Sequence, residues 1–217
     1  MTWFWVKAAG HHGYPQPEDS YLEQTYSAVC HHCGIHAEQS TPFRFKAEPK
    51  ASHSQFLQLN WVFDAFFVRP EVAVDCASVS LTGLNFTHVL RHSTGLALST
   101  VAQMQIPTVV RCALVDHLPP VTCRPYNEEG VPPHPALVKG AYCNRVKHHP
   151  PTTLGVASKA LHGLPDIFQT EEWFGSGGSA WRATLVSERF AQLIRSRRWR
   201  GVSLEEIALD APCERAI

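Results

Sequence analysis

The sequence carries no net charge, because 19 lysines and arginines balance 19 aspartates and glutamates. Proteins that bind nucleic acid over a broad surface are normally basic, since they must neutralise phosphate groups. The charge balance argues against a general nucleic-acid binder, and we do not expect nucleic acid to be the partner. A uniformly acidic mimic of nucleic acid is excluded on the same ground.

A long apolar run is also missing. The densest apolar stretch, residues 61–68, is interrupted by Asp64 and is followed by Arg69 and Pro70. A membrane-spanning helix needs about 20 apolar residues. The apolar start at residues 1–6 is too short for a secretory signal and lacks the basic beginning of one. The sequence therefore predicts a cytoplasmic protein that does not enter a membrane.

Catalytic motifs are missing as well. The sequence has no HExxH helix, and its glycine-rich segment 175–179 lacks the Gly-Lys-Ser/Thr ending of a phosphate-binding loop. His88 and His92 have a spacing that suits a helix, but two ligands do not make a catalytic zinc site. Cys112 and His117 are a candidate nucleophile and base without an identifiable oxyanion partner. We therefore predict that the protein is not an enzyme and has no catalytic residues.

The composition, with 44% hydrophobic and 18% charged residues, is typical of a globular protein with a real core. We predict a single α+β domain over residues 1–217, mostly antiparallel sheet with a few helices and a zinc-ribbon-like knuckle near the N-terminus. Residues 119–151 contain eight prolines and should form a long irregular excursion. Excursions of this length are usually functional, stapled by a metal or mobile.

Periodicity places several elements along the chain. Apolar residues at helical spacing predict a helix over 54–67, and turn residues around 83–98 indicate a hairpin-like region. A helix capped by Ser187 and ended by Gly201 is the clearest prediction. Strands are expected at 1–7, 107–115, 181–186 and 202–207.

Seven cysteines are present, at positions 30, 33, 76, 112, 123, 143 and 213. Their number is odd and their spacing uneven, so free thiols or a metal site are better explanations than a disulfide framework. The most informative pair lies in the knuckle Cys30-His-His-Cys33-Gly34, where two thiolates can grip one Zn²⁺ in a tight turn. A redox motif of the same spacing needs a strand before it and a helix after it, which the surroundings do not predict.

A closed structural zinc site needs four ligands, and one knuckle supplies two. The candidates for the remaining ligands are His36, Cys123, Cys143, His148 and His149. Cys30, Cys33, His36 and Cys143 form a chemically acceptable set for a structural zinc ion. A knuckle that holds no metal is an alternative that the sequence leaves open.

These features resemble the double-CXXCG-motif immunity proteins of bacterial polymorphic toxin systems. The aromatic start Met1-Thr-Trp-Phe-Trp5 is similar to the opening strand of that family, and Cys30–Gly34 looks like its first motif. The closing segments Asp166–Phe168, Leu185–Phe190 and Gly201–Val202 also fit. Each match is short, and the matches are spread along the chain.

The second motif departs from the family pattern. Its best candidate is Gly140-Ala-Tyr-Cys143-Asn-Arg145, in which Cys143 matches the second cysteine and Arg145 a following basic residue. Gly140 stands where a cysteine is expected, and Asn144 where a glycine is expected. Alternatively, Cys123 is the surviving cysteine of the second motif.

The resemblance implies a cytoplasmic protein that binds a cognate toxin and blocks it by stoichiometric occlusion, without catalysing a reaction. A metal-dependent zinc enzyme that uses histidine and cysteine ligands is one alternative. A zinc-knuckle adaptor that binds protein or nucleic acid is another. Loops 10–19 and 119–151 are the expected contact regions, because loops commonly carry recognition.

Six tryptophans are large, stiff side chains that can serve as core or as contacts. We expect Trp173 and Trp199 to be exposed contacts, because they border predicted loops. The other four should belong to the core: Trp3, Trp5, Trp61 and Trp181.

Overall fold

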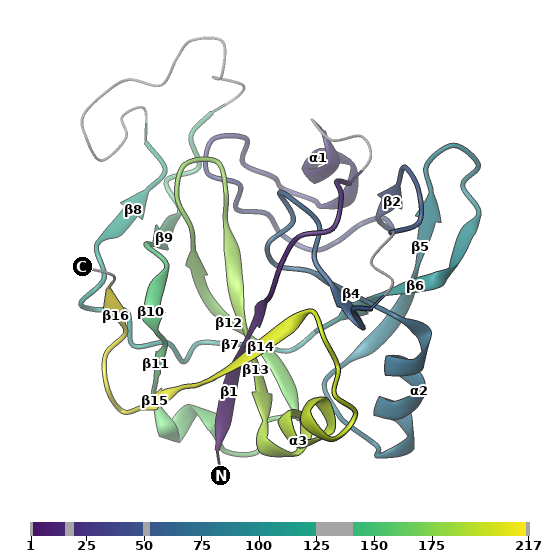
Figure 1. Cartoon of the computed structure of the whole chain (residues 1–217). Helices are drawn as coiled ribbons and strands as arrows, with labels where there is room; N and C mark the ends of the chain where they lie inside the picture. The colour runs from purple at the N-terminus through teal and green to yellow at the C-terminus, as the bar shows by residue number, and fades with distance from the viewer. Residues whose placement is uncertain (1, 16–19, 50–52, 125–140, 216–217) are drawn as a thin grey trace.

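Two β-sheets that share a hydrophobic core carry the fold (Figure 1). The computed structural model describes residues 2–15, 20–49, 53–124 and 141–215. The larger sheet has seven strands, in the order β14 (Val202–Glu206), β1 (Trp3–Ala8), β13 (Trp181–Ser187), β12 (Ile167–Phe174), β9 (Val146–His148) and β8 (Pro120–Thr122), with β7 (Val109–Val110) paired to β12. Its four longer strands are antiparallel, whereas β7 and β9 join β12 in parallel.

The smaller sheet has five strands. Their order is β2 (Arg44–Phe45), β5 (Asn85–Arg91), β6 (Ala97–Gln105), β4 (Phe66–Val68) and β3 (Phe56–Leu57). Strands β5 and β6 form the hairpin that the turn residues around 83–98 predict. Two further strand pairs join β10 (Pro151–Thr153) to β16 (Glu214–Arg215) and β11 (Gly155–Val156) to β15 (Ala208–Leu209).

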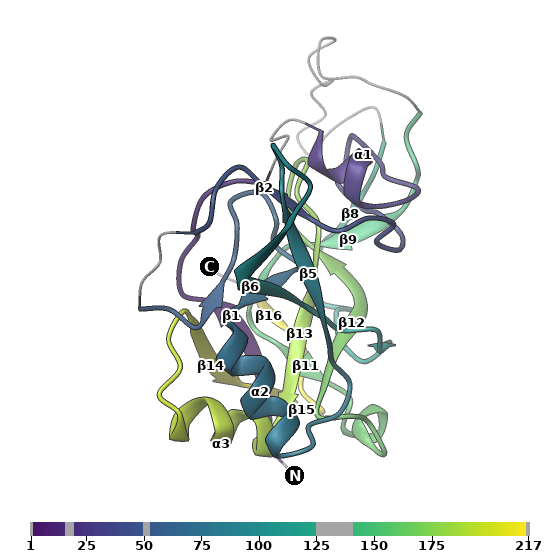
Figure 2. The same cartoon turned by 90° about the vertical axis from the view of Figure 1, so that its right-hand side faces the viewer.

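Three α-helices and one 3-10 helix complete the described part of the chain. They are α1 (Tyr21–Thr25), α2 (Pro70–Ser78), α3 (Glu188–Ser196) and the 3-10 helix η2 (Ser158–Leu161). Helices α2 and α3 lie at one end of the molecule, beside the N-terminus, and α1 lies at the opposite end with β8 and β9 (Figure 2). The chain is thus mostly β with few helices, consistent with the predicted α+β class. None of the helices in the described ranges has the length and apolar character needed to cross a membrane.

Helix α3 shows how local sequence sets an element. The Ser187 side chain accepts a hydrogen bond from the Phe190 backbone N–H at 3.3 Å, which caps the helix as predicted. Phe190, Leu193 and Ile194 are buried on one face, where they pack with strand β1 and the shared core. The helix ends at Ser196, before the predicted end at Gly201, and Arg198 already has a left-handed φ of +53°. Gly201 follows with a φ of +97°, in the region that favours glycine.

The predicted helix at 54–67 is wrong. The segment instead contains strands β3 and β4 joined by irregular backbone. Its apolar side chains divide between two cores, because Phe56 and Phe66 face the shared core while Leu57 and Phe67 face a second cluster behind the five-stranded sheet. Apolar residues on both faces produced a spacing that resembled one helical face.

The predictions for three tryptophans and one strand are also wrong. Trp173 and Trp199 are buried, while Trp61, which we expected in the core, is 60% exposed on a loop at a φ of +68°. Of the expected strand at 107–115, only β7 forms. The proline-rich excursion contributes β8 and β9, and its residues 125–140 lie outside the described part of the chain.

Candidate metal centre

Four cysteine side chains converge, two from the segment that follows α1 and two from the segments between β8 and β9. Helix α1 and strands β8 and β9 lie toward the same end of the molecule (Figure 1). The Sγ atoms of Cys30, Cys33, Cys123 and Cys143 all lie within 4.8 Å of one another. The Cys30–Cys123 and Cys33–Cys143 sulfur pairs are each separated by 3.6 Å. Tetrahedral zinc with Zn–S bonds of about 2.3 Å requires sulfur atoms about 3.8 Å apart. The spacing and the donor type therefore fit one zinc ion held by four thiolates.

The first knuckle closes through two backbone hydrogen bonds. The N–H of Gly34 donates to the carbonyl of Cys30, and the N–H of Cys30 donates to the carbonyl of Ile35, both at 2.9 Å. Gly34 adopts a φ of +77°, in the left-handed region that glycine enters without strain. This turn brings the Cys30 and Cys33 thiols to the same side of the chain.

The second knuckle repeats the same pattern with residues far apart in the sequence. The N–H of Asn144 donates to the carbonyl of Cys123 at 3.2 Å, and the N–H of Cys123 donates to the carbonyl of Arg145 at 2.9 Å. Asn144 occupies the position of Gly34 and has a φ of +55°, a conformation that asparagine tolerates better than most residues. Strands β8 and β9 lead into and out of this knuckle, which residues 124–142 interrupt.

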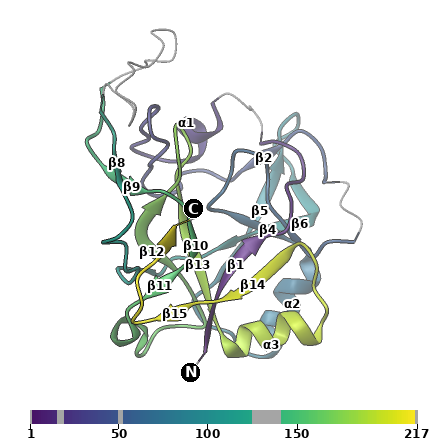
Figure 3. The same cartoon turned by 60° about the vertical axis from the view of Figure 1, so that its left-hand side comes forward.

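The turn between β12 and β13 packs on the first knuckle and rises between α1 and the β8–β9 pair (Figure 3). A Cβ atom added at Gly34 would lie 2.2 Å from the Gly178 carbonyl oxygen and 3.1 Å from the Ala180 nitrogen. Glycine at position 34 is thus required both by the backbone conformation and by this close approach. Segment 175–179 is the hairpin turn of two antiparallel strands, as the lack of a phosphate-loop ending indicated.

Lys147 joins the knuckle to that turn. Its side chain is 1% exposed, and its Nζ donates to the carbonyls of Cys33 at 2.9 Å and of Gly177 and Ser179 at 2.7 Å each. Burial lowers the pKa of Lys147 below its usual value, and the charges of the neighbouring cysteines offset part of this shift. An ammonium group with all three protons donated suits a site where several thiolates gather, because it offsets part of their negative charge.

The pKa values of Cys30, Cys33 and Cys123 are shifted in different directions. Burial raises the pKa of Cys30, but hydrogen bonds from the backbone of Cys33 and His32 outweigh it and lower this pKa to about 6. Burial raises the pKa of Cys123 to about 11. Burial, together with the nearby Cys30 thiolate, also raises the pKa of Cys33. The Cys30 thiolate forms readily, and its negative charge disfavours ionisation of the Cys33 and Cys123 thiols. A bound divalent cation would remove this repulsion.

The structure places His36 differently from the predicted ligand set. Its Nε2 lies 2.8 Å from the Asp64 Oδ2, its Nδ1 lies 3.0 Å from the Ala37 carbonyl, and its ring stacks on Tyr26 with centroids 3.6 Å apart. His36 therefore forms a buried ion pair beside the cluster, and Cys123 takes the fourth position. This histidine also meets Trp173 edge-on, at a centroid distance of 5.1 Å.

Among the predicted ligands, Cys30, Cys33 and Cys143 come together, and His36 does not join them. Cys123 was an alternative that the resemblance left open, and no local signal distinguished it. Lys147 and Asp64 were not foreseen, because each acts through partners distant in the sequence. His148, a further candidate, lies in β9 with its ring 6.4 Å from that of Phe174.

No protein-family model matches the chain, and no curated protein matches it in sequence.

Proposed function

We propose that Cys30, Cys33, Cys123 and Cys143 hold one structural zinc ion. The convergence of four sulfur atoms within 4.8 Å carries this proposal. Four thiolates complete the tetrahedral coordination of zinc and leave no position for a substrate or a reactive water. The alternative of a zinc enzyme at this site is disfavoured for that reason. The role of the metal is to join the first knuckle to the second knuckle at the ends of strands β8 and β9.

We further propose that the protein is an immunity protein, which neutralises a cognate toxin by binding it and blocking its active site or the path of its substrate. The resemblance in the first knuckle and the closing segments supports this. The left-handed conformation of Asn144, which stands where the family has a glycine, adds to it. Zero net charge weighs against the nucleic-acid adaptor.

Two exposed aromatic side chains mark a candidate contact surface. Tyr14 is 46% exposed and Trp61 is 60% exposed. Their loops are joined because the backbone and side-chain nitrogens of Asn60 both donate to the Gly13 carbonyl, at 2.9 and 3.1 Å. The Tyr21 hydroxyl also donates to the Trp61 carbonyl. Fixed, exposed aromatic residues are typical anchors of protein interfaces, and this surface includes one end of the loop predicted to make contacts.

Co-expression with the product of the neighbouring gene tests the immunity function. We expect a stable one-to-one complex and restored growth of cells that express a toxic neighbour. Trp61→Ala should weaken the complex by about 30-fold or more if this residue is an anchor. Leu96→Ala removes an equally exposed apolar side chain from the β5–β6 turn and is the matched control. A toxic neighbour that neither binds nor is neutralised would contradict the immunity function, whatever the zinc content.

A further inference from the structure

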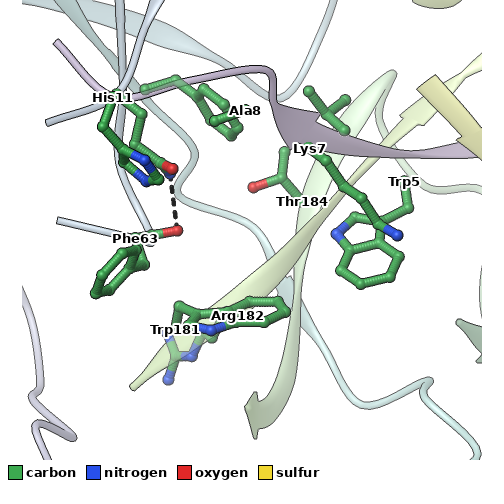
Figure 4. Close-up of a pocket in the computed structure, with 11 residues that line it drawn as sticks. Trp5, Lys7, Ala8, His11, Phe63, Trp181, Arg182 and Thr184 are labelled. Carbon is green, nitrogen blue, oxygen red and sulfur yellow. Dashed lines mark hydrogen bonds between the residues drawn. The ribbon is translucent and has the colours of Figure 1, made fainter. Parts of the chain in front are cut away.

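A pocket of about 270 Å³ lies between β1, β13 and the segment that joins β3 to β4 (Figure 4). Its lining includes four aromatic side chains, Trp5, Phe63, Phe66 and Trp181, and three basic ones, Lys7, His11 and Arg182. None of the described residues that line the pocket is acidic. The cavity therefore combines apolar walls with positive charge, and it is separate from the cysteine cluster.

Arg182 is the strongly basic group in the pocket whose charge has no ion-pair partner within the described residues. Its guanidinium packs over the ring of Trp173 at 4.5 Å, and its Nε is enclosed by protein atoms, without an acceptor in the described part of the chain, so only the rest of the guanidinium can meet a ligand. Burial lowers the pKa of Arg182 below its usual value, and the charges of Asp64 and Glu171 offset part of this shift. The described contacts include no ion pair to this guanidinium. A partly desolvated cation without an ion pair favours the binding of an anion that enters the pocket.

Lys7 differs from Arg182, because its charge is already matched. Its Nζ pairs with Glu205 and lies 3.8 Å from the centroid of the Trp5 ring. The indoles of Trp5 and Trp181 stack with centroids 5.8 Å apart and an interplanar angle of 21°, which gives the pocket a flat wall. His11 lies edge-on to Phe63 at a centroid distance of 5.7 Å, and the two rings are on the side of the pocket opposite Trp5 and Lys7 (Figure 4).

We propose that this pocket binds a carboxylate carried on an aromatic or short apolar stem, with Arg182 as its hydrogen-bond donor and the indoles as its wall. One unmatched positive charge suits a carboxylate better than a doubly charged phosphate. The small volume excludes a nucleotide or a long chain. The carboxylate belongs either to a free small acid or to an acidic side chain of a bound protein, since both present the same chemistry. The proposal depends on neither the zinc site nor the toxin.

NMR titration of the ¹⁵N-labelled full chain tests the proposal. The N–H signals of the indoles and of the arginine side chains are followed as each probe is added. The probes are benzoate, its neutral counterpart benzamide, inorganic phosphate, and a blocked peptide that carries an aspartate beside a phenylalanine. We expect saturable shifts at the Trp181 indole with benzoate or the acidic peptide, and none with benzamide or phosphate. Binding of benzoate alone assigns a small acid as the source, and binding of the peptide alone assigns a protein side chain.

Variants locate the binding group. Arg182→Met retains the stem of the side chain and should lower the affinity for the acid about tenfold or more, because a charge-assisted hydrogen bond is lost. Arg111→Met removes an exposed arginine outside the pocket and should leave the affinity unchanged. Equal binding of benzoate and benzamide by the unaltered chain would overturn the proposal without any variant. Absence of shifts with every acid would also overturn it, as would full affinity in a folded Arg182→Met protein.

Discussion

The two knuckles of the cysteine cluster have the same backbone geometry and opposite sequence organisation. In the first, Cys30 and Cys33 are separated by two residues, and in the second, Cys123 and Cys143 are separated by residues 124–142. Both close with the same two hydrogen bonds and with a left-handed residue after the second cysteine. The comparison teaches that the site is defined by hydrogen bonds and backbone conformation, and that the Cys-x-x-Cys spacing is only the commonest way to reach them.

The knuckles also differ in what supports them. The first packs against the β12–β13 turn, where Gly34 approaches Gly178 and Lys147 binds Cys33. The second is held by its own strands, since β8 and β9 pair directly beside it. We therefore expect substitutions around the first knuckle to have the larger effects, and changes in the length of the chain between Cys123 and Cys143 to be tolerated.

Gly34→Ala should have the largest effect. The added Cβ would lie 2.2 Å from the Gly178 oxygen, so the turn must move and the first knuckle must open. We expect a loss of about 4 kcal/mol in the free energy of unfolding, from steric overlap and from a strained φ. Urea unfolding measures the loss of stability, and the zinc content of the purified protein shows whether the first knuckle still holds the metal.

Gly163→Ala is the matched control for that experiment. Gly163 has a φ of +71°, close to that of Gly34, but nothing lies within 4 Å of an added Cβ. Its cost should be limited to the conformational strain of about 1 kcal/mol, with zinc content unchanged. Equal effects of the two substitutions would mean that the contact with the β12–β13 turn contributes nothing.

Lys147→Met tests the connection between the first knuckle and the turn. The substitution removes a buried ammonium group and leaves three carbonyls without their donor. We expect a destabilisation of about 3 kcal/mol and weaker zinc binding, because unsatisfied buried acceptors and an uncompensated thiolate cluster both result. Lys159→Met, on the exposed 3-10 helix, should change neither quantity.

Restoring a contiguous second knuckle should have a smaller effect, in the opposite direction. Deletion of residues 125–141 leaves Cys123-Arg-Tyr-Cys143 and retains Tyr142, whose ring stacks on His32 at 3.9 Å. Shortening the loop roughly tenfold lowers its closure cost by about 2 kcal/mol. Zinc affinity, measured by competition with a chelator, should therefore rise. Loss of zinc binding in a folded deletion variant would show that the two knuckles are not equivalent.

The smallest effect concerns the His36–Asp64 pair beside the first knuckle. Burial lowers the pKa of His36, but the Asp64 carboxylate outweighs it, and the net pKa is raised above its usual value. The stabilisation by this pair is complete below about pH 6.5 and is lost as the pH rises through the raised pKa. Zinc-loaded protein should show this loss in urea unfolding, and Asp64→Asn should abolish it. His162→Gln, at an exposed position, should retain it.

The sequence predicted the parts of the fold whose causes are local. Helix α3 and strands β1, β13 and β14 follow from capping residues and apolar patterns within each segment. The helix predicted at 54–67 was wrong because the segment contributes apolar side chains to two separate cores. That division depends on elements distant in the sequence that pack on each face of the segment. Trp199 was placed on the surface for the same kind of reason, since the neighbour that buries it, Phe56, comes from the same distant segment.

The cysteine cluster shows the same limit. The sequence indicates Cys30 and Cys33 because a knuckle is a local motif, and it offers Cys143 as one of several candidates for the remaining ligands. His36 was chosen for its closeness in sequence, whereas Cys123 reaches the cluster through the pairing of β8 with β9. Strand pairing of this kind links residues that a pattern of fixed spacing does not connect.

Metal analysis of the purified full chain, combined with zinc X-ray absorption, tests the central claim most directly. The four-cysteine site predicts one zinc ion per chain with four sulfur ligands at about 2.3 Å. It also predicts that Cys123→Ser removes the metal, while His36→Gln retains it with an unchanged spectrum. A protein without stoichiometric metal, or a spectrum with a nitrogen ligand that His36→Gln abolishes, would contradict the account.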